Sequence, residues 1–571
     1  MERGQVHYEV FVRVSAAAPW RLELATENRT QATTLAEEML QDKRAVSVRV
    51  TKETLDPESM EFQSVTLFTR GLPEPARRPK PSSASNEPPC LSPSDLYASY
   101  AREKIGRVLD DWLRRQRVTP FELLHRPDLA ERLEASGMEM QHAIQKIAVP
   151  ESQATGQSIH DVMRAYQGLS EKAIERLIQT GRRNRFPDLS REPIGDVARR
   201  LVGEEDRSFL LGGAICGALA QAKSPREKVS MLLDFVERAP DEAQPNALVR
   251  VVVEQPLAEI LATPEGLADV LGPELDLGGN LAALTRLAAP EEVEALIRVE
   301  PGLARQIPEL GGPAARLGAQ MQSGAFKMLG AYIARRVLKE LTGPRRLRPS
   351  DARGEIDILR ALAMALTASA GRLLSLDEVQ EAFMQRSKAI VTADFVEAFL
   401  KGAPNGRMEA EWLVRLCENV TGAANKREAA RWLLAAISSL RFEKELRTAP
   451  ESPATSLATL AALQRSVRGA GLNETDTGQI VRKVGEIGGL VEADARVCDQ
   501  IVRAPAPAVQ KLTLLLRLAS GEAAPVGPAS EKARGEVMRL LRSPDAREAP
   551  MGSPEAAGKL RPMLQAVGLA A

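Results

Sequence analysis

The sequence predicts a mostly α-helical protein in which a long irregular helical array, solenoid-like or bundle-like, follows a small ββαββ module of the α+β type on a disordered linker. Near the N-terminus apolar residues alternate with a period of two, whereas beyond residue 94 they recur every three to four residues. A Pro- and Ser-rich segment separates the two patterns. Aromatic residues make up only 4% of the chain, which favours helices packed through aliphatic side chains over a β-sandwich.

The module is predicted over residues 1–71. In its first strand Val10, Val12 and Val14 share an apolar face, and His7 and Glu9 point to the opposite face. The expected elements are strands over 6–14 and 19–24, a helix over 28–41, and strands over 45–52 and 61–69. We therefore expect an antiparallel sheet with one helix on its apolar face. Its edge strands offer unpaired backbone groups that a partner strand or a second copy of the chain would extend.

Three further segments complete the predicted domain organisation. Residues 72–94 form a linker whose Pro and Ser content buries too little apolar surface to fold, so we expect a disordered tether. Residues 95–343 form a first helical lobe and residues 344–571 a second lobe, with the division placed at Gly343-Pro344. The tether lets the module reorient relative to the lobes, which favours two separable functions.

Helix starts in the first lobe are marked by a capping residue or by a proline. We expect one helix from Asp95 to Arg117, and Thr119-Pro120 begins the next, with Glu122 in the capping-box position. Similar starts occur at Ser224-Pro225, Thr263-Pro264, Ala289-Pro290 and Glu300-Pro301. The longest apolar pattern runs over residues 321–341, with a stripe formed by Phe326, Leu329, Ile333, Val337 and Leu341.

Helices also follow one another through the second lobe. They are expected near residues 353–370, 376–386, 392–401, 407–420, 426–440, 454–469, 474–487, 491–503, 506–519 and 529–542, with a short helix after residue 553. Consecutive helices on short loops pack as antiparallel neighbours. No repeat consensus recurs, so the sequence leaves open whether the array is a regular solenoid or an irregular helical domain.

Charge and hydropathy restrict the classes of partner and compartment. Lys plus Arg and Asp plus Glu each number 76, so the formal net charge is zero and no global field attracts nucleic acid or an anionic membrane. The first residues lack the basic and apolar regions of a signal peptide. The longest uncharged stretch, residues 208–222, is shorter than the roughly 20 apolar residues of a membrane span. We expect a protein of a bacterial-type cytoplasm without membrane insertion.

No residue pattern in the chain predicts a catalytic residue, a metal site or a cofactor. Gly212-Gly213 lies inside a helical apolar run, where small residues permit close helix packing, and no strand precedes it as a phosphate-binding loop requires. Structural or solvated roles are expected for the histidines, and the cysteines lack the short paired spacings of zinc or redox sites. These residues are His7, His125, His142, His160, Cys90, Cys216, Cys417 and Cys498.

One segment is locally basic. Its cations lie at the end of a predicted helix and in the loop that follows, and acidic residues offset only part of their charge. They are Arg335, Arg336, Lys339, Arg345, Arg346 and Arg348, with Arg353 nearby. One interpretation is that they complement the helix dipole and a solvated loop. The other is an anion- or partner-binding site for a phosphate-bearing ligand, a nucleic acid backbone or an acidic protein segment.

The helical array, the tethered module and the lack of a catalytic pattern together favour a non-enzymatic adaptor or regulatory scaffold. Such a protein binds partner proteins through its helical surface and its N-terminal module. The alternative is a regulatory nucleic-acid- or nucleotide-binding protein that uses the arginine cluster near residues 335–353. A third hypothesis is an enzyme whose site is assembled from helices far apart in the sequence. The identity of a partner, the oligomeric state and the biological process stay open.

Overall fold

The computed structural model describes residues 6–15, 18, 20–55, 62–71, 90–542 and 554–569. The chain divides into two compact units, Met1–Leu91 with Ile144–Gln167, and Ser92–Ala143 with Gly168–Ala571. Each is described by itself. The predicted linker lies outside the described residues over positions 72–89.

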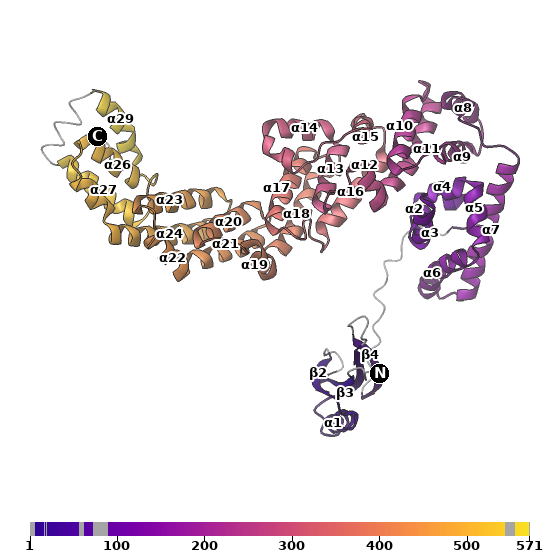
Figure 1. The fold of residues 1–571 in the computed structure, drawn as a ribbon, viewed down its shortest axis with the longest axis horizontal. Helices are drawn as coiled ribbons and strands as arrows, with labels where there is room; N and C mark the ends of the chain where they lie inside the picture. Colours follow the sequence, from indigo (N-terminus) through magenta and orange to yellow (C-terminus); the bar gives the residue numbers. More distant parts are fainter. Residues whose placement is uncertain are drawn as a thin grey trace. The chain divides into compact units, whose positions relative to one another are not determined.

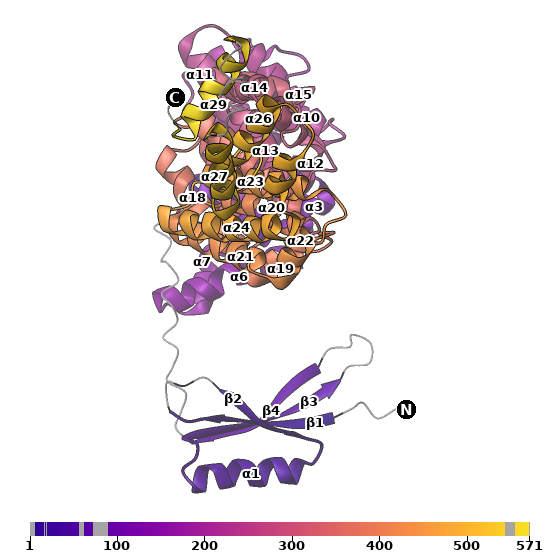
Figure 2. The ribbon, with the colours of Figure 1, turned by 90° about the vertical axis from the view of Figure 1, so that its left-hand side faces the viewer.

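The N-terminal module contains the five predicted elements in the predicted order. They are β1 (Val6–Arg13), β2 (Arg21–Thr26), α1 (Arg29–Gln41), β3 (Ser47–Leu55) and β4 (Phe62–Gly71). The strands form one antiparallel sheet in the order β2-β1-β3-β4, with β1 and β3 in the middle. Figure 2 shows α1 lying along one face of this sheet. The predicted ββαββ arrangement is therefore confirmed.

The core of the module lies between α1 and one face of the sheet. Val10, Val12, Val48 and Val50 are at most 3% exposed, because the period of two puts these strand residues on the helix side. From the helix, Ala32, Ala36 and Met39 complete the core. Asn28 caps α1 by accepting hydrogen bonds from the N–H groups of Thr30 and Gln31. Val14 was expected on the same apolar face, but β1 ends at Arg13 and Val14 is 68% exposed.

The helices of the rest of the chain follow closely on one another (Figure 1). Up to residue 342 they are η1 (Pro93–Tyr97), α2 (Ser99–Val108), α3 (Asp110–Gln116), α4 (Pro120–His125), α5 (Pro127–Ala135), α6 (Met138–Thr155), α7 (Ile159–Arg182), α8 (Ile194–Leu201), α9 (Arg207–Leu219), α10 (Pro225–Glu237), α11 (Ala243–Ala262), α12 (Pro264–Leu271), α13 (Leu277–Ala288), α14 (Pro290–Val299), η2 (Pro301–Arg305), α15 (Pro313–Gln322) and α16 (Lys327–Thr342). Helices α6 and α7 each contain residues of both units.

After residue 343 most helices match the predicted series, but α22 (Leu440–Arg447) was not predicted and α24 (Glu474–Ala495) continues past its expected end at residue 487. They are α17 (Ala352–Ala368), α18 (Leu376–Ile390), α19 (Ala393–Leu400), α20 (Gly406–Asn419), α21 (Ala423–Ile437), α22 (Leu440–Arg447), α23 (Pro453–Gly469), α24 (Glu474–Ala495), α25 (Val497–Arg503), α26 (Ala508–Ala519), α27 (Pro528–Arg542) and α29 (Pro554–Ala566). The pairs α20/α21, α23/α24 and α26/α27 pack as sequential neighbours, as short loops require. Earlier in the chain, α13 packs against α15, α16 and α17, which are not its next neighbour in sequence, so the array is irregular there.

Two predicted helices are interrupted. The single helix expected from Asp95 to Arg117 is instead η1, α2 and α3, because Ala98 has an extended backbone conformation (ψ 147°) and a second break follows at Leu109. The pattern over residues 321–341 is divided between α15 and α16 by a turn at Gly324, whose φ of +78° is in the left-handed region. The stripe from Phe326 to Leu341 is nonetheless buried throughout.

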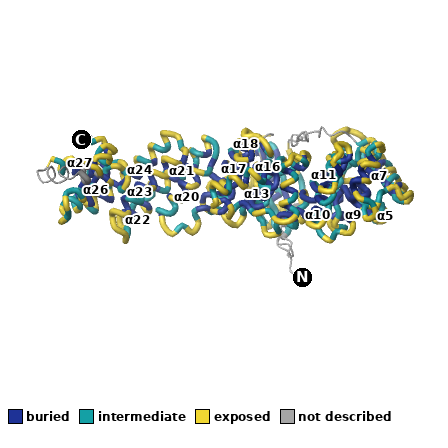
Figure 3. Tube along the Cα trace, turned by 90° about the horizontal axis from the view of Figure 1, so that it is seen from above, coloured by how far each residue is buried: buried dark blue, intermediate teal, exposed yellow. Residues whose placement is uncertain are grey.

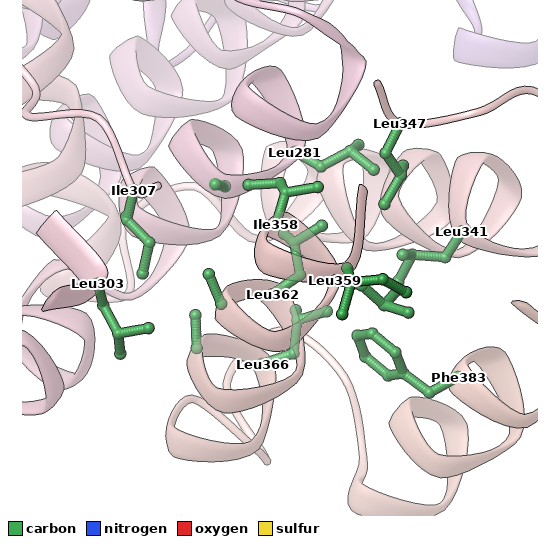
Figure 4. Close-up of a cluster of buried hydrophobic side chains, with 14 of the residues drawn as sticks. Leu281, Leu303, Ile307, Leu341, Leu347, Ile358, Leu359, Leu362, Leu366 and Phe383 are labelled. Carbon is green, nitrogen blue, oxygen red and sulfur yellow. The ribbon is translucent and has the colours of Figure 1, made fainter. Parts of the chain in front are cut away.

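One large hydrophobic cluster runs through most of the helical unit, and a second, small cluster that includes Trp112 and Leu129 lies near its start. The members of the large cluster begin at Phe121 and end at Val567, and Figure 3 shows buried residues along the whole helical part with exposed residues outside them. Leu341 and Leu347, on either side of the predicted boundary at residue 344, both belong to this cluster. They lie close to Leu359 and Phe383 in Figure 4. The two-lobe division therefore stays a prediction, since no gap in this core marks it.

A buried ion pair links α17 and α18 close to the predicted boundary at residue 344. An Oε atom of Glu355 on α17 lies 2.7 Å from Nη2 of Arg386 on α18, and the two side chains are only 1% and 2% exposed. The other Oε atom accepts the N–H of Arg348 at 2.6 Å, and Nη1 of Arg386 donates to the carbonyl of Gly343 at 3.0 Å. The loop after α16 is thus fixed by charged hydrogen bonds to the next two helices.

Carboxylates also connect helices elsewhere in the array. Glu254 on α11 accepts the N–H of Leu329 at the start of α16, and Glu259, also on α11, accepts the N–H of Phe121 at the start of α4. N–H groups in the first turn of a helix have no partner inside that helix, so a carboxylate there satisfies a donor and complements the helix dipole. Polar contacts of defined geometry therefore add to the apolar packing between helices.

Candidate partner-binding surfaces

The face of the N-terminal sheet opposite α1 carries a hollow of about 470 Å³. No helix of the module covers this face among residues 6–15, 18, 20–55 and 62–71 (Figure 2). The hollow is lined by His7, Glu9, Phe11, Trp20, Arg49, Thr51, Glu53 and Thr66. Most of these side chains come from the two central strands, β1 and β3. Successive side chains of a strand point to opposite faces, so these residues lie on the face opposite the buried valines.

Trp20 is the centre of this surface. The guanidinium groups of Arg13 and Arg49 lie 5.0 Å and 4.5 Å from the centre of its ring, which is cation–π geometry. Nearby, Nε2 of His7 lies 3.2 Å from a carboxylate oxygen of Glu9. The hydroxyl of Thr51 and the indole N–H of Trp20 are buried and have no hydrogen-bond partner within the described residues. Aromatic rings, a guanidinium and carboxylates thus surround one hollow.

The edges of the sheet are the other exposed feature of the module. β2 and β4 are its outer strands, and neither pairs with a further strand in the described part of the chain. Leu22 on β2 and Val65 on β4 are 47% and 59% exposed. Such edges present a row of backbone donors and acceptors that another strand would complete.

Three of the six cations predicted to form an anion site make contacts inside the protein. Arg336 donates through Nη1 to the carbonyl of Leu261, 2.9 Å away, at the end of α11. The guanidinium of Arg346 lies 5.3 Å from the ring centre of Phe395. Arg348 donates through Nε to the Asp276 carboxylate at 2.9 Å. These contacts are explained by helix capping and packing, without an external anion.

The other three predicted cations are exposed. Arg335 has one distant ion pair, at 3.9 Å from Glu103, in which both side chains are more than half exposed. Lys339 lies on the same helix and Arg345 in the loop after it. The fold therefore separates the predicted cluster into three residues held by the protein and three that face solvent.

A cleft of about 800 Å³ in the helical unit was not expected from the sequence. It lies where residues of α2, α3 and α4 meet the loop between α9 and α10 and the start of α12. Three predicted helix starts border this cleft, Thr119-Pro120, Ser224-Pro225 and Thr263-Pro264. Thr119, Ser224 and Thr263 accept hydrogen bonds as caps, as expected. Local sequence patterns do not indicate that all three starts border one cleft, because that depends on the packing of distant helices.

The buried histidine and the glycine pair have structural roles. Nδ1 of His125 donates to the carbonyl oxygen of Phe121, 2.8 Å away, and the ring packs against Tyr97, Phe121 and Phe209. Burial lowers the pKa of His125 from 6.5 to about 3, so the ring is neutral at pH 7. A Cβ atom on Gly212 would lie 2.5 Å from Nε2 of His125, and one on Gly213 would lie 2.1 Å from the Phe186 ring. The predicted packing role of this pair is confirmed.

The described residues contain no group of three or more His, Cys, Asp and Glu side chains placed to hold a metal ion. Within the same residues, every helix is too short or too polar to cross a membrane. Comparison of the chain with protein-family models, with curated proteins and with solved structures finds no match.

Proposed function

We propose that this protein is a non-enzymatic adaptor or regulatory scaffold, in which the N-terminal module recognises a partner protein and the helical unit presents a second surface. The observation that carries the proposal is the uncovered sheet face around Trp20 and Phe11. Tryptophan and arginine are enriched among the residues that dominate binding energy at protein interfaces. On this face Arg49 and Arg13 lie against the Trp20 ring, next to the hollow.

The edge strands support the same proposal by a second route. A partner segment in extended conformation would add to β4, whose exposed Val65 offers an apolar contact beside the backbone hydrogen bonds. The module lies in one compact unit, with Ile144–Gln167, and most of the helices lie in the other, so a partner that contacts both units is held by two linked interactions. Linked interactions raise the overall affinity without a larger interface on either unit.

A bacterial-type cytoplasm is the compartment that we propose for this adaptor. Cys216, Cys417 and Cys498 are buried thiols on three separate helices, which suits a reducing environment. Burial raises the pKa of Cys417 and of Cys498 to about 12, so neither thiol is activated for redox chemistry.

The test compares affinity capture by the full chain with capture by a chain that begins at Ser94, each followed by quantitative mass spectrometry. We expect proteins that the full chain recovers and the shorter chain loses, because the module is the proposed recognition element. Proteins recovered equally by both chains bind the helical unit. If neither chain recovers a partner above an unrelated control and the full chain elutes as a monomer, the proposal is wrong.

The arginine segment supports a second candidate function, nucleic-acid or nucleotide binding. Arg335, Lys339 and Arg345 are exposed and would contact the nucleic acid or nucleotide. The other three cations of the segment already have partners in the fold. A site of three phosphate contacts predicts that binding weakens with a slope near −2 to −3 in log affinity against log salt. Substituting Arg345 and Lys339 with Glu abolishes that binding if the segment carries it.

A further inference from the structure

The cleft beside α4 has the size of a small-molecule site. Its volume of about 800 Å³ lies within the range of roughly 300–1,000 Å³ that is usual for ligand pockets. Leu113, Val118, Leu219 and Ile260 supply apolar surface, and small residues among the lining leave the space unfilled. These small residues are Gly106, Ala220, Ala222 and Gly266. An apolar body of moderate size therefore fits between the helices.

Most charges that line the cleft are already neutralised. The ammonium of Lys228 donates to both carboxylate oxygens of Glu122, at 2.9 Å and 2.8 Å, and to the carbonyl of Arg117 at 2.8 Å, which uses all three of its protons. Arg126 forms two hydrogen bonds with Asp128, which holds the pKa of that carboxyl below its ordinary value. Lys228 therefore has no proton left for a ligand, and the charge of Arg126 is compensated by Asp128.

The acidic residues at the opening are also occupied. Arg114 lies 3.3 Å from a carboxylate oxygen of Asp110 and 3.7 Å from one of Glu265. The carboxylate of Asp269 accepts the N–H of Arg226 in the first turn of α10 at 2.7 Å. An anion that enters the cleft therefore meets carboxylates whose charge is compensated by a neighbouring donor.

Two cations remain without a polar partner. The guanidinium of Arg117 and the ammonium of Lys223 line the cleft, are exposed, and form no side-chain hydrogen bond or ion pair with the residues that the structure describes. The bond from Lys228 to the Arg117 carbonyl fixes the loop before α4 against the first turn of α10, and Lys223 directly precedes the cap of α10. Both cations are thus exposed in the lining of one cleft, whose apolar residues Leu113, Leu219 and Ile260 are buried.

From this arrangement we infer that the cleft binds a small organic anion, in which a carboxylate, sulfonate or phosphate group pairs with Arg117 and Lys223 and an apolar body rests on Leu113, Leu219 and Ile260. The first-turn N–H groups of α10 are already bound to Asp269 and Ser224, so the two side chains carry the pairing. The inference does not depend on the proposed adaptor function. It gives the helical unit a ligand site of its own.

The test uses the full chain and the fluorescent probe 8-anilinonaphthalene-1-sulfonate, with octanoate and octan-1-ol as competitors. We expect octanoate to displace the probe and octan-1-ol, which has the same apolar body without the charge, to displace it roughly 10-fold less effectively, as the loss of a charge-assisted contact predicts. The double variant Arg117→Gln with Lys223→Gln weakens octanoate binding roughly 10-fold. The matched control is Lys401→Gln with Arg468→Gln, two exposed cations distant in sequence from the cleft.

A third variant, Ala220→Trp, tests the location of the site by filling the cleft from an exposed position. Loss of probe binding in this variant, together with unchanged thermal unfolding, supports the inference. Equal competition by octanoate and octan-1-ol, unchanged octanoate affinity in the Arg117/Lys223 double variant, or unchanged binding in Ala220→Trp each overturns it.

Discussion

The buried pair between Glu355 and Arg386 gives the sharpest prediction about what holds the array together. In Glu355→Gln the side chain keeps its shape, but the Arg386 guanidinium stays buried without an opposite charge. Within the described residues Glu355 is the one carboxylate paired with Arg386, whose Nε has no partner and whose Nη1 keeps only the Gly343 carbonyl. Breaking a buried pair by removing one partner costs about 3–5 kcal/mol. The amide of Gln also directs a donor toward either Arg386 or the Arg348 N–H, both of which are donors.

Hydrogen exchange measured by mass spectrometry detects the loss of stability segment by segment. A local measurement is needed because a chain of this length need not unfold in one step. A loss of about 3–5 kcal/mol in the free energy of opening accelerates exchange roughly 150-fold to 5,000-fold in α17, α18 and the loop between Gly343 and Asp351. The control is Glu411→Gln, which removes an exposed pair with Arg407 whose side chains are 41% and 42% accessible. Such a pair contributes about 0.5 kcal/mol or less. Equal exchange in the two variants would refute the reasoning.

Three further predictions concern single buried groups. His125 has a pKa of about 3 in the folded chain and 6.5 in the unfolded chain, so between these pH values only the unfolded state binds the proton. The free energy of unfolding therefore falls by about 2 kcal/mol from pH 7.5 to pH 5. Urea titrations at the two pH values measure this difference, which is smaller in His125→Asn. In Ellman titration of the native chain at pH 8 we expect Cys90, the one partly exposed thiol, to react before Cys216, Cys417 and Cys498, which react only after denaturation. Gly213→Ala destabilises α9 by about 1–3 kcal/mol, because the added methyl group meets the Phe186 ring. In the control Gly217→Ala the Cβ has open space around it, so the thermal unfolding temperature is unchanged or higher.

The sequence predicted those elements whose signal is local. The alternation of Val10 and Val12 and the stripe from Phe326 to Leu341 each report which side of an element is buried, and both match the fold. The capping box at Thr119 and Glu122 is present as expected. Local patterns were less informative where the backbone breaks inside an apolar run, as at Ala98 and Gly324, because the period of the apolar residues continues through the break.

The surfaces could be predicted less well, since they depend on residues brought together by packing. The charges of Arg336, Arg346 and Arg348 are visible in the sequence, but their partners Leu261, Phe395 and Asp276 are not. The hollow at Trp20 needed the register of β1 against β3, which places Phe11 opposite Arg49. The cleft beside α4 needed three loops from distant positions to meet. In each case the sequence shows the type of the residues but does not predict which other residues they contact.

The account depends most on the claim that the uncovered face of the N-terminal sheet is the recognition surface. The direct measurement is quantitative capture of partners by full chains that carry Trp20→Ala or Arg49→Ala, beside the control Arg21→Ala, an arginine of the same module whose side chain is 78% exposed and paired with Glu23. The account predicts that the first two substitutions remove those partners that the full chain recovers and the chain beginning at Ser94 loses, and that Arg21→Ala retains them. Retention of every partner by both Trp20→Ala and Arg49→Ala would contradict it.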